Sequence, residues 1–285
     1  DLDPRAMPVI EAKGPSLVLV RAGRAAGAVA MTATLAEAER RSKQQGCCIC
    51  LIAQTTHTGA IGQYAGRLAQ RGLATLLMGA GSPMMAYHGA RIPSLSTSPI
   101  ALGVPAPGRP LVIDMATAVA AIGRLRASKN DAAPLPDGMA LDAQGVPTTD
   151  PARAATVLPI GGAKGSGLSL LIECLTSLMA SAPILTLTVG PAGDGRHRHN
   201  ALLIAIDVAT LHGDLAAYTA EVGRLQALVK SLEPRPGFEE LLLPGERGER
   251  VAEQRRREGI PLSASTWNSL VSVASAAVVA LPETQ

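Results

Sequence analysis

The segment CCICLIAQTTHTGAIGQYAGRLAQRGLATLLMGA (47–80) decides the fold class. Its first part, CCICLIA (47–53), is a continuous apolar run of strand length, which indicates a strand buried on both faces. IGQYAGRLAQRG (61–72) predicts a helix, and LATLLMGA (73–80) predicts the next strand. A strand, a helix and a strand at this spacing form a βαβ-like unit, so we expect an α/β or mixed fold.

Further elements are predicted on both sides of this segment. LVLVRAG (17–23) is an apolar run that ends at a glycine, which predicts a strand. Residues 28–45 carry Ala, Leu and Met on one side and charged side chains on the other, and Gly46 is typical of a helix C-cap. Two more strands are expected at 110–116 and 201–207, and helices are expected at 167–180, 215–232, 249–259 and, as a packed terminal helix, 269–281.

The remaining segments suggest how the chain is divided. Residues 1–15 have no periodic pattern and are expected to form an entering linker. A mixed α/β domain is expected over 16–214 and a helical C-terminal region over 215–285. Residues 81–110 and 128–160 are rich in proline and are predicted to be long loops, and loops of this length inside a domain are usually functional.

The composition excludes several classes of protein. The 285 residues are 47% hydrophobic and 17% charged, which excludes disorder for the bulk of the chain. Aromatic residues make up 2% and the net charge is +3, so no nucleic-acid partner is expected. No apolar stretch reaches the roughly 18 residues that span a bilayer, so no membrane insertion is expected either.

The cysteines point to a reducing compartment. Three of them share one short apolar run, where adjacent positions cannot form a disulfide framework, and no CxxC pair with a histidine partner is present. We therefore expect free thiols, no metal site and a cytoplasmic protein. The four are Cys47, Cys48, Cys50 and Cys174.

The segment TTHTGAIGQYAG (55–66) is the first candidate site. It follows a buried strand and opens a helix, which is where α/β sheets bind ligands. His57 lies at the carboxyl end of the strand, Gly59 and Gly62 allow close approach of the backbone, and the helix N-terminus favours an anion. A lone histidine at a strand end is equally well explained as a structural residue.

The segment LPIGGAKGSGLSLLIE (158–173) is the second candidate site. Four glycines surround Lys164 directly before an apolar helix, a pattern that favours anion binding. It is not a Walker A loop, because the lysine precedes Gly165, and the chain has no G-x-G-x-x-G fingerprint. Tight helix packing also explains the glycines, and a hydrolase based on Ser166 lacks the G-x-S-x-G elbow.

Two strand-end segments form a third candidate. STSPIAL (96–102) precedes VIDMATA (112–118), in which Asp114 ends a predicted strand and Thr117 supplies a hydroxyl. Taken alone, both are ordinary polar groups at a strand end.

Other polar residues carry weaker signals. His88 is expected at the surface, and His197 and His199 in GRHRHN are expected in a solvated basic turn rather than as metal ligands. Arg247 in PGERGER (244–250) either approaches a phosphate or belongs to an ordinary helix start.

The order of these segments resembles the malate/L-lactate/ureidoglycolate dehydrogenase family. The resemblance covers roughly residues 1–270, and its most specific parts are the His57 segment and GGAKGSGL (161–168). It implies a non-Rossmann nucleotide-binding fold with a mixed sheet and flanking helices, NAD or NADP as cofactor, and a homodimer. It also implies hydride transfer to a small 2-oxo acid or a cyclic imine acid. The matching segments are TTHTGAIGQYA, STSPIA, VIDMAT, PTTDP, LPIGGAKGSGLSLLIE, ALLIAID, LLPGE and REGIPL followed by Trp267.

The resemblance also implies roles for individual residues. His57 would supply or relay the proton, because an unperturbed histidine titrates near pH 6.5. Lys164 would hold the substrate carboxylate. The positions implied to contact the cofactor are Gly59, Ala60, Thr97, Ser98, Pro99, Asp114, Met115, Ala116, Thr117, Gly165, Gly245, Glu246 and Arg247.

Three departures from the family pattern motivate an alternative. The family has Asn at the position of Ser98 and usually Ser at that of Ala118, and both changes would alter cofactor hydrogen bonds. The family also begins with a helical segment that carries a Ser-His-Gly motif, and we expect that this chain lacks that segment. The alternative is a dimer that binds a cofactor or metabolite without turnover.

Overall fold

A computed structural model describes residues 2–131, 133–182, 184–185 and 199–281. Contacts divide the chain into two compact units, Asp1–Pro244 and Gly245–Gln285, which are described separately. The boundary predicted at residue 214 therefore differs from this division and stays a prediction.

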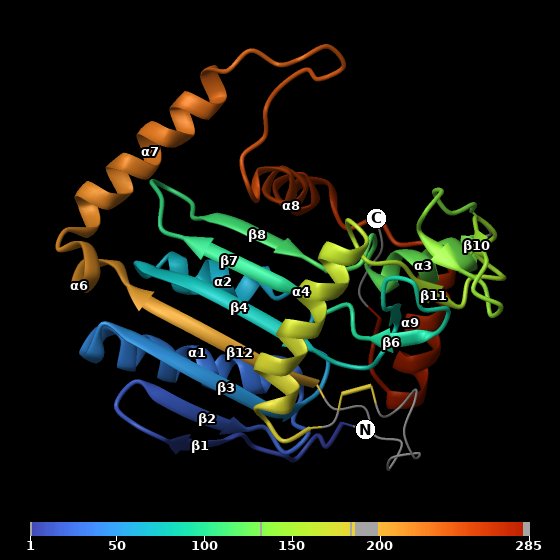
Figure 1. The fold of residues 1–285 in the computed structure, drawn as a ribbon, viewed down its shortest axis with the longest axis horizontal. Coiled ribbons are helices and arrows are strands. Elements are labelled where there is room, and N and C mark those ends of the chain that lie inside the picture. Colours follow the sequence, from blue (N-terminus) through green and yellow to red (C-terminus); the bar gives the residue numbers. More distant parts are fainter. Residues whose placement is uncertain (1, 132, 183, 186–198, 282–285) are drawn as a thin grey trace. The chain divides into compact units, whose positions relative to one another are not determined.

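A seven-stranded sheet forms the centre of the first unit (Figure 1). Only β2 and β3 pair in parallel; the other neighbours are antiparallel. Because β12 runs antiparallel to both β3 and β4, these two strands point the same way, and so do β2 and β8. Their carboxyl ends therefore lie along one edge of the sheet, together with the amino ends of β12 and β7. The order is β1 (Val9–Ala12), β2 (Leu17–Arg21), β3 (Cys47–Thr55), β12 (His199–Asp207), β4 (Leu73–Ala80), β7 (Ile100–Val104) and β8 (Leu111–Met115).

Helices cover both faces of this sheet. In Figure 1, α4 (Ala163–Glu173) crosses in front of the strands, while α1 (Gly27–Gln45) and α2 (Gly62–Ala69) lie behind them. The helix α4 continues as a π-helical turn, η1 (Cys174–Leu178), which packs on β12, β3 and β4. Gly46 ends α1 in the left-handed conformation that a C-cap requires, with φ of 81°.

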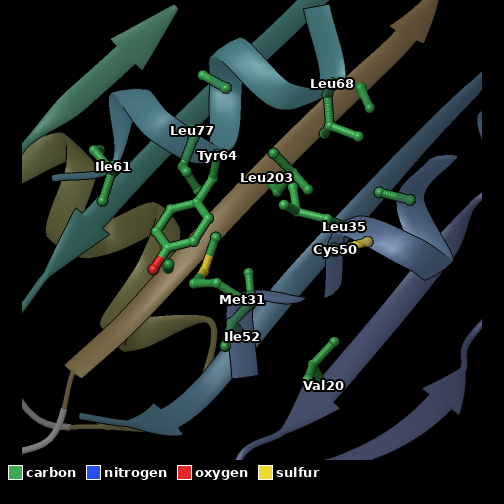
Figure 2. Packing of buried hydrophobic residues seen from close by; sticks show 14 of the residues in the cluster. Val20, Met31, Leu35, Cys50, Ile52, Ile61, Tyr64, Leu68, Leu77 and Leu203 are labelled. Atoms are coloured by element: carbon green, nitrogen blue, oxygen red, sulfur yellow. The ribbon is translucent and has the colours of Figure 1, made fainter. Parts of the chain in front are cut away.

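The main core lies between the sheet and the helices α1 and α2 (Figure 2). The apolar positions of α1 recur every three or four residues, so Met31 and Leu35 face the strands. Ile52 of β3 and Leu203 of β12 meet them, and all four side chains are buried. Tyr64 of α2 places its ring in this cluster, while its hydroxyl reaches the loop before α2. The core is therefore built from aliphatic and small side chains, as the low aromatic content requires.

A second, five-stranded sheet has its own small core. Its members are two- or three-residue strands that surround the buried side chains of Met85, Leu95 and Val157. The partly buried Ile122 of α3 (Ile122–Asp131) packs against them. The strand order is β10 (Pro147–Thr148), β9 (Ala140–Leu141), β11 (Thr156–Val157), β5 (Met85–Ala86) and β6 (Pro93–Leu95).

The rest of the described chain is helical. The first unit ends with α6 (Val208–His212) and α7 (Leu215–Ser231), whose N-cap Asp214 accepts the N–H groups of Ala216 and Ala217. The second unit contains α8 (Glu246–Glu258) and α9 (Ala264–Ala277), which bury no residue. None of the helices in the described ranges combines the length and the apolar content needed to cross a membrane.

The mixed α/β class predicted from the sequence is confirmed, and most individual elements are too. The strands β2, β3, β4, β8 and β12 and the helices α1, α2, α4, α7 and α8 overlap the predicted ranges. Three expectations are wrong in part: residues 1–15 contain β1, 81–110 contain β5, β6 and β7, and 128–160 contain β9, β10 and β11. The terminal helix is present, but α9 buries no side chain, so it is not packed as expected.

Leu203→Ala tests the place of β12 at the centre of the core. Leu203 is 0% exposed, so its truncation leaves a cavity and lowers the free energy of unfolding by about 2–5 kcal/mol, measured by urea denaturation. Leu211→Ala is the matched control, because Leu211 is 77% exposed and its truncation costs less than about 0.5 kcal/mol. Equal losses in the two variants would contradict a central β12.

Candidate functional site

The edge of the large sheet where β3, β4 and β8 end brings the predicted segments together. His57 follows β3, Thr117 follows β8, and the Thr97–Pro99 segment leads into β7 at the same edge. The glycine-rich turn around Lys164 joins this edge because the N–H of Ile160 donates to the carbonyl oxygen of Thr117 at 2.8 Å. The candidate site is therefore a row of loop segments along one sheet edge.

The loop that carries His57 is held by contacts with α1 and α2. The Thr56 hydroxyl oxygen accepts the N–H of Gly27 at 2.9 Å and thereby caps α1. A Cβ on Gly27 would lie 2.3 Å from the His57 carbonyl oxygen, so only glycine allows this approach. The Tyr64 hydroxyl donates to the Thr58 carbonyl oxygen at 2.9 Å. These contacts fix the backbone on both sides of His57 while its side chain stays exposed.

A second histidine lies beside the first. His199 begins β12, and its ring meets that of His57 edge-on, with 6.0 Å between the ring centroids. A Cβ on Gly81 would lie 2.6 Å from the His199 ring, so the end of β4 also packs tightly against it. His199 was expected in a solvated turn, and this expectation is wrong because the residue is part of β12. His197 lies outside the described residues.

The hydroxyl of Thr55, at the end of β3, lies next to these histidines in the sequence and in the sheet. Thr55 pairs with His199 across the β3–β12 ladder. Among the described residues, its Oγ1 is the buried side-chain polar atom without a hydrogen-bond partner. Because such an atom costs free energy unless it is satisfied, it marks this end of the edge as a place for a polar partner.

Asp114 joins β8 to the start of α2. Its Oδ2 accepts the N–H of Gly62 at 2.7 Å, at the start of α2, while the carboxylate remains exposed. A negative charge at a helix N-terminus is stabilised by the helix dipole. A Cβ on Gly62 would come within 2.7 Å of the Asp114 Cβ, so glycine is required at this contact. Asp114 thus acts first as a cap that holds α2 against β8.

The segments around Thr97 and Lys164 share a second set of hydrogen bonds. The N–H and the hydroxyl of Thr117 donate to the Thr97 carbonyl oxygen at 2.9 and 3.0 Å. Lys164 lies on the first turn of α4 and is exposed. His88 is exposed, as expected, but its backbone N–H donates to the Ser166 hydroxyl at 3.0 Å. Ser166 is fully buried and bonded to backbone groups, which disfavours a nucleophilic role.

Both positions that depart from the family pattern are buried. Ser98 is 0% exposed, and its hydroxyl lies 2.7 Å from that of Ser96 and 2.9 Å from that of Ser169. Ala118 belongs to the core of the small sheet. Neither side chain therefore presents a group at the surface of the site, and the predicted loss of cofactor hydrogen bonds at these positions finds no support in the geometry.

Glu173, which was not among the predicted site residues, lies at the end of α4 beside the segment Ser96–Pro99. It is 4% exposed at the end of α4, and its Oε1 accepts the N–H of Ser96 at 2.6 Å. Burial raises the pKa of the Glu173 carboxyl to about 7, and the hydrogen bonds from the backbone and the hydroxyl of Ser96 oppose this rise only in part. A single carboxylate in the apolar run GLSLLIECLTSLMA was the available signal.

Three of the residues predicted to contact the cofactor lie outside the first unit. Gly245, Glu246 and Arg247 belong to the second unit, where Gly245 precedes α8, so their contact with a cofactor stays a prediction. Within the described ranges, no three His, Cys, Asp or Glu side chains are grouped so as to hold a metal ion. The four cysteines are free thiols, and Cys48 and Cys50 are buried.

The groups along this edge fit a dinucleotide. The N-terminus of α4 lies there with Lys164 on its first turn, and such a terminus favours an anion, whereas the N-termini of α1 and α2 are already capped by the Thr56 hydroxyl and the Asp114 carboxylate. The exposed carboxylate of Asp114 supplies a polar partner of the kind that a ribose requires.

The fold and this row of groups define an α/β protein whose candidate ligand site lies along one sheet edge, without a Rossmann fingerprint. Residues 1–271 match the sequence profile of the malate/L-lactate dehydrogenase family. The chain belongs to this family, and its members are dehydrogenases, so the protein is an enzyme of that class.

Known relatives agree with this assignment. The chain is 28% identical over 266 residues to ureidoglycolate dehydrogenase (NAD(+)) of Escherichia coli O157:H7, which covers 92% of this chain and 76% of the relative. It is 32% identical over 275 residues to delta(1)-pyrroline-2-carboxylate reductase of Ancylobacter novellus, covering 93% and 78%. The solved structure of sulfolactate dehydrogenase from Methanocaldococcus jannaschii is 28% identical, with a TM-score of 0.85 over 98% of this chain and 80% of that chain.

The raised pKa of Glu173 makes stability depend on pH. The unfolded carboxyl titrates near 4.5 and the folded one near 7, so the folded state retains a proton between these values. The free energy of unfolding therefore falls as the pH rises through this window, by roughly 3 kcal/mol from this group. Urea denaturation at several pH values measures the slope.

Glu173→Gln is expected to remove this component of the slope, because an amide does not titrate. Glu221→Gln on the exposed face of α7 is the matched control and keeps the wild-type slope. A wild-type slope in Glu173→Gln would contradict the titration of Glu173.

Proposed function

We propose that the protein is an NAD(P)-dependent oxidoreductase that interconverts a small 2-oxo acid and its 2-hydroxy acid, of the malate or lactate type. The observation that supports this most directly is the placement of His57, Asp114 and the Lys164 turn along one edge of the sheet. The names of the relatives support a hydroxy-acid substrate. The nicotinamide, when bound, supplies or accepts the hydride.

His57 is proposed to supply the proton to the forming alkoxide. Its ring is exposed at the end of β3, and its Nδ1 accepts the N–H of Gly59 at 3.2 Å. This bond exists only with the neutral ring, whose hydrogen is on Nε2; when the ring is charged both nitrogens carry a hydrogen, the bond from Gly59 is released, and the imidazolium can donate a proton. Because the His57 backbone is fixed by Gly27 and Thr58, the ring is held at one place along the edge.

Lys164 is proposed to bind the substrate carboxylate. The ammonium lies on the first turn of α4, where the helix dipole adds to its charge. The same turn joins Thr117 through Ile160, so the carboxylate would be held next to the segment that contacts the cofactor. Thr97, Ser98, Pro99, Met115, Ala116 and Gly165 are proposed to line the cofactor site chiefly through backbone groups.

A cyclic imine acid is the alternative substrate. The 32% identity to the delta(1)-pyrroline-2-carboxylate reductase of Ancylobacter novellus favours it. Both substrate classes place a reducible carbon next to a carboxylate, so the proposed roles of His57 and Lys164 apply to either. A cytoplasmic location is also proposed, because all four thiols are free.

The test is oxidation of NADH and of NADPH, followed by absorbance, with a panel of 2-oxo acids and cyclic imine acids. His57→Ala is expected to lower kcat by about 10²–10⁴-fold, as general acids typically contribute that much. His212→Ala, at an exposed site on α6, is the control and keeps the wild-type rate. Lys164→Met is expected to raise KM for the acid more than it lowers kcat.

A His57→Ala rate within a few-fold of wild type would contradict the proton-transfer role. Cofactor binding without oxidation by any substrate of the panel would favour the alternative of a binding protein without turnover.

We also propose that the protein forms a homodimer through α4 and η1. These helices expose a row of large apolar side chains on one face, and such a row is unusual on a monomer. Leu171 is the most exposed of them, at 62%. The row consists of Leu168, Leu171, Leu175, Leu178 and Met179.

Leu171→Glu is expected to shift the protein from dimer to monomer, because the interface would then bury an unpaired charge. Size-exclusion chromatography with light scattering measures the change. Leu211→Glu, at an isolated exposed position on α6, is the control and stays dimeric. A dimeric Leu171→Glu variant, or a monomeric wild type at micromolar concentration, would overturn this interface.

A further inference from the structure

Glu173 and three serines form a buried polar cluster between α4 and the segment before β7. Ser96 and Ser98 belong to that segment, and Ser169 and Glu173 lie on α4, one turn apart. All four are less than 9% exposed. A carboxyl and three hydroxyls buried in an apolar layer cost free energy unless each has a hydrogen-bond partner. Because these four groups supply partners to one another, a change in one bond affects the others.

The contacts within this cluster connect two walls of the candidate site. The Ser96 N–H donates to Glu173 Oε1 at 2.6 Å, and the Ser96 hydroxyl lies 2.7 Å from that of Ser98. Ser169 lies 3.0 Å from the Ser96 carbonyl oxygen and 2.9 Å from the Ser98 hydroxyl. These bonds hold the segment Ser96–Pro99, called the Ser96–Pro99 wall below, against α4. Lys164 lies at the opposite end of the same helix.

The Ser169 hydroxyl has two possible acceptors within this cluster. Each serine hydroxyl has one hydrogen to donate, so Ser169 satisfies either the Ser96 carbonyl oxygen or the Ser98 hydroxyl. An ionised Glu173 only accepts, and it takes the Ser96 N–H in a charge-assisted hydrogen bond.

A protonated Glu173 is neutral, so its hydrogen bond from the Ser96 N–H loses this charge assistance and is weaker. The charge on Glu173 thus decides how strongly this hydrogen bond holds the Ser96–Pro99 wall.

We infer that Glu173 is a positioning residue whose carboxylate holds the Ser96–Pro99 wall in the conformation that binds the cofactor. This inference rests on the proposed function, since it assigns that wall to the cofactor site. The short contact between the Ser96 N–H and an ionised carboxylate is charge-assisted and is stronger than one to a neutral acid. Affinity for the cofactor is therefore higher when Glu173 is ionised.

The surroundings of Glu173 make this ionisation respond to solvent pH near neutrality. Burial raises the pKa of Glu173 to about 7. Within the described residues, the elements that pack most on α4 are β4, β6 and η1; β4 and β6 carry no titratable side chain, η1 carries Cys174, and the His88 ring lies beside Gly162 at the start of α4, far from Glu173. On α4 itself, Lys164 lies on the exposed first turn, at the opposite end from Glu173.

The experiment measures the Kd of NADH and of NADPH, by fluorescence of the reduced nicotinamide, at pH 6 and pH 8 on the full chain. The wild type is expected to bind about tenfold more tightly at pH 8, within the usual range of such couplings. Glu173→Gln is expected to bind as weakly at both pH values as the wild type does at pH 6. Glu221→Gln, an exposed change of the same chemistry, is expected to behave as the wild type.

A second variant and a second readout keep the test decisive if Glu173→Gln does not fold. Ser96→Ala keeps the carboxyl and its bond from the backbone N–H but removes a hydroxyl that lowers the pKa of Glu173, so the pH response between pH 6 and pH 8 is expected to shrink about threefold. Hydrogen exchange of the peptide that contains Ser96–Pro99, without cofactor, is expected to slow from pH 6 to pH 8 in the wild type after correction for intrinsic rates. The same peptide in Glu173→Gln is expected to show no such change.

The experiment distinguishes a failure of the role of Glu173 from a failure of the proposed function. Wild-type binding and turnover without a pH response, or a Glu173→Gln variant that retains the wild-type response, would overturn the role of Glu173 alone. A folded wild type that binds neither NADH nor NADPH at either pH would overturn the proposed function, and this inference with it.

Discussion

The insertion of β12 between β3 and β4 is the constraint on which the rest of the first unit depends. Its ladder runs from Ala201 to Ile206 against β3 and from Asn200 to Asp207 against β4. This pairing leaves β3 and β4 pointing in the same direction, so the loops that follow them meet at one edge. The same strand buries Leu203 in the core and places His199 at that edge. Packing and site formation are therefore consequences of one backbone arrangement.

The local parts of this arrangement were predictable and the non-local parts were not. Continuous apolar runs and helical periodicity are properties of neighbouring residues, which is why β3, α2 and β4 were predicted within a few residues. The place of β12 depends on pairing with strands far away in the sequence, and nothing in its own residues encodes a partner. The strand β7 was missed because Pro99 and Pro105 bracket it; they lie just outside the ladder, where they remove none of its hydrogen bonds.

The candidate site shows the same division. His57 and the Lys164 turn carry local signals, namely a strand end, glycines and a helix start, and the structure places both at one edge. Asp114 was predicted as a polar strand end, but its bond to Gly62 joins residues that are distant in the chain. His199 and Glu173 were not predicted as site residues because their contacts, His199 with His57 and Glu173 with Ser96, join segments that are distant in the sequence. The local signal for Glu173 was its carboxylate inside the apolar helical run 167–180.

The buried cluster at Glu173 explains why the serine at position 98 is compatible with a functional site. Ser98 has a φ of 22°, outside the usual regions for a residue with a side chain. Such strain persists only where the surroundings over-determine the backbone, and here Ser96, Ser169 and Glu173 do so through a closed set of hydrogen bonds. The side chain at this position bonds to Ser96 and Ser169 instead of facing the surface, so under the proposed function only backbone groups of this segment would face the cofactor. A change of residue type at position 98 is then a change in how the wall is held, and it need not remove the site.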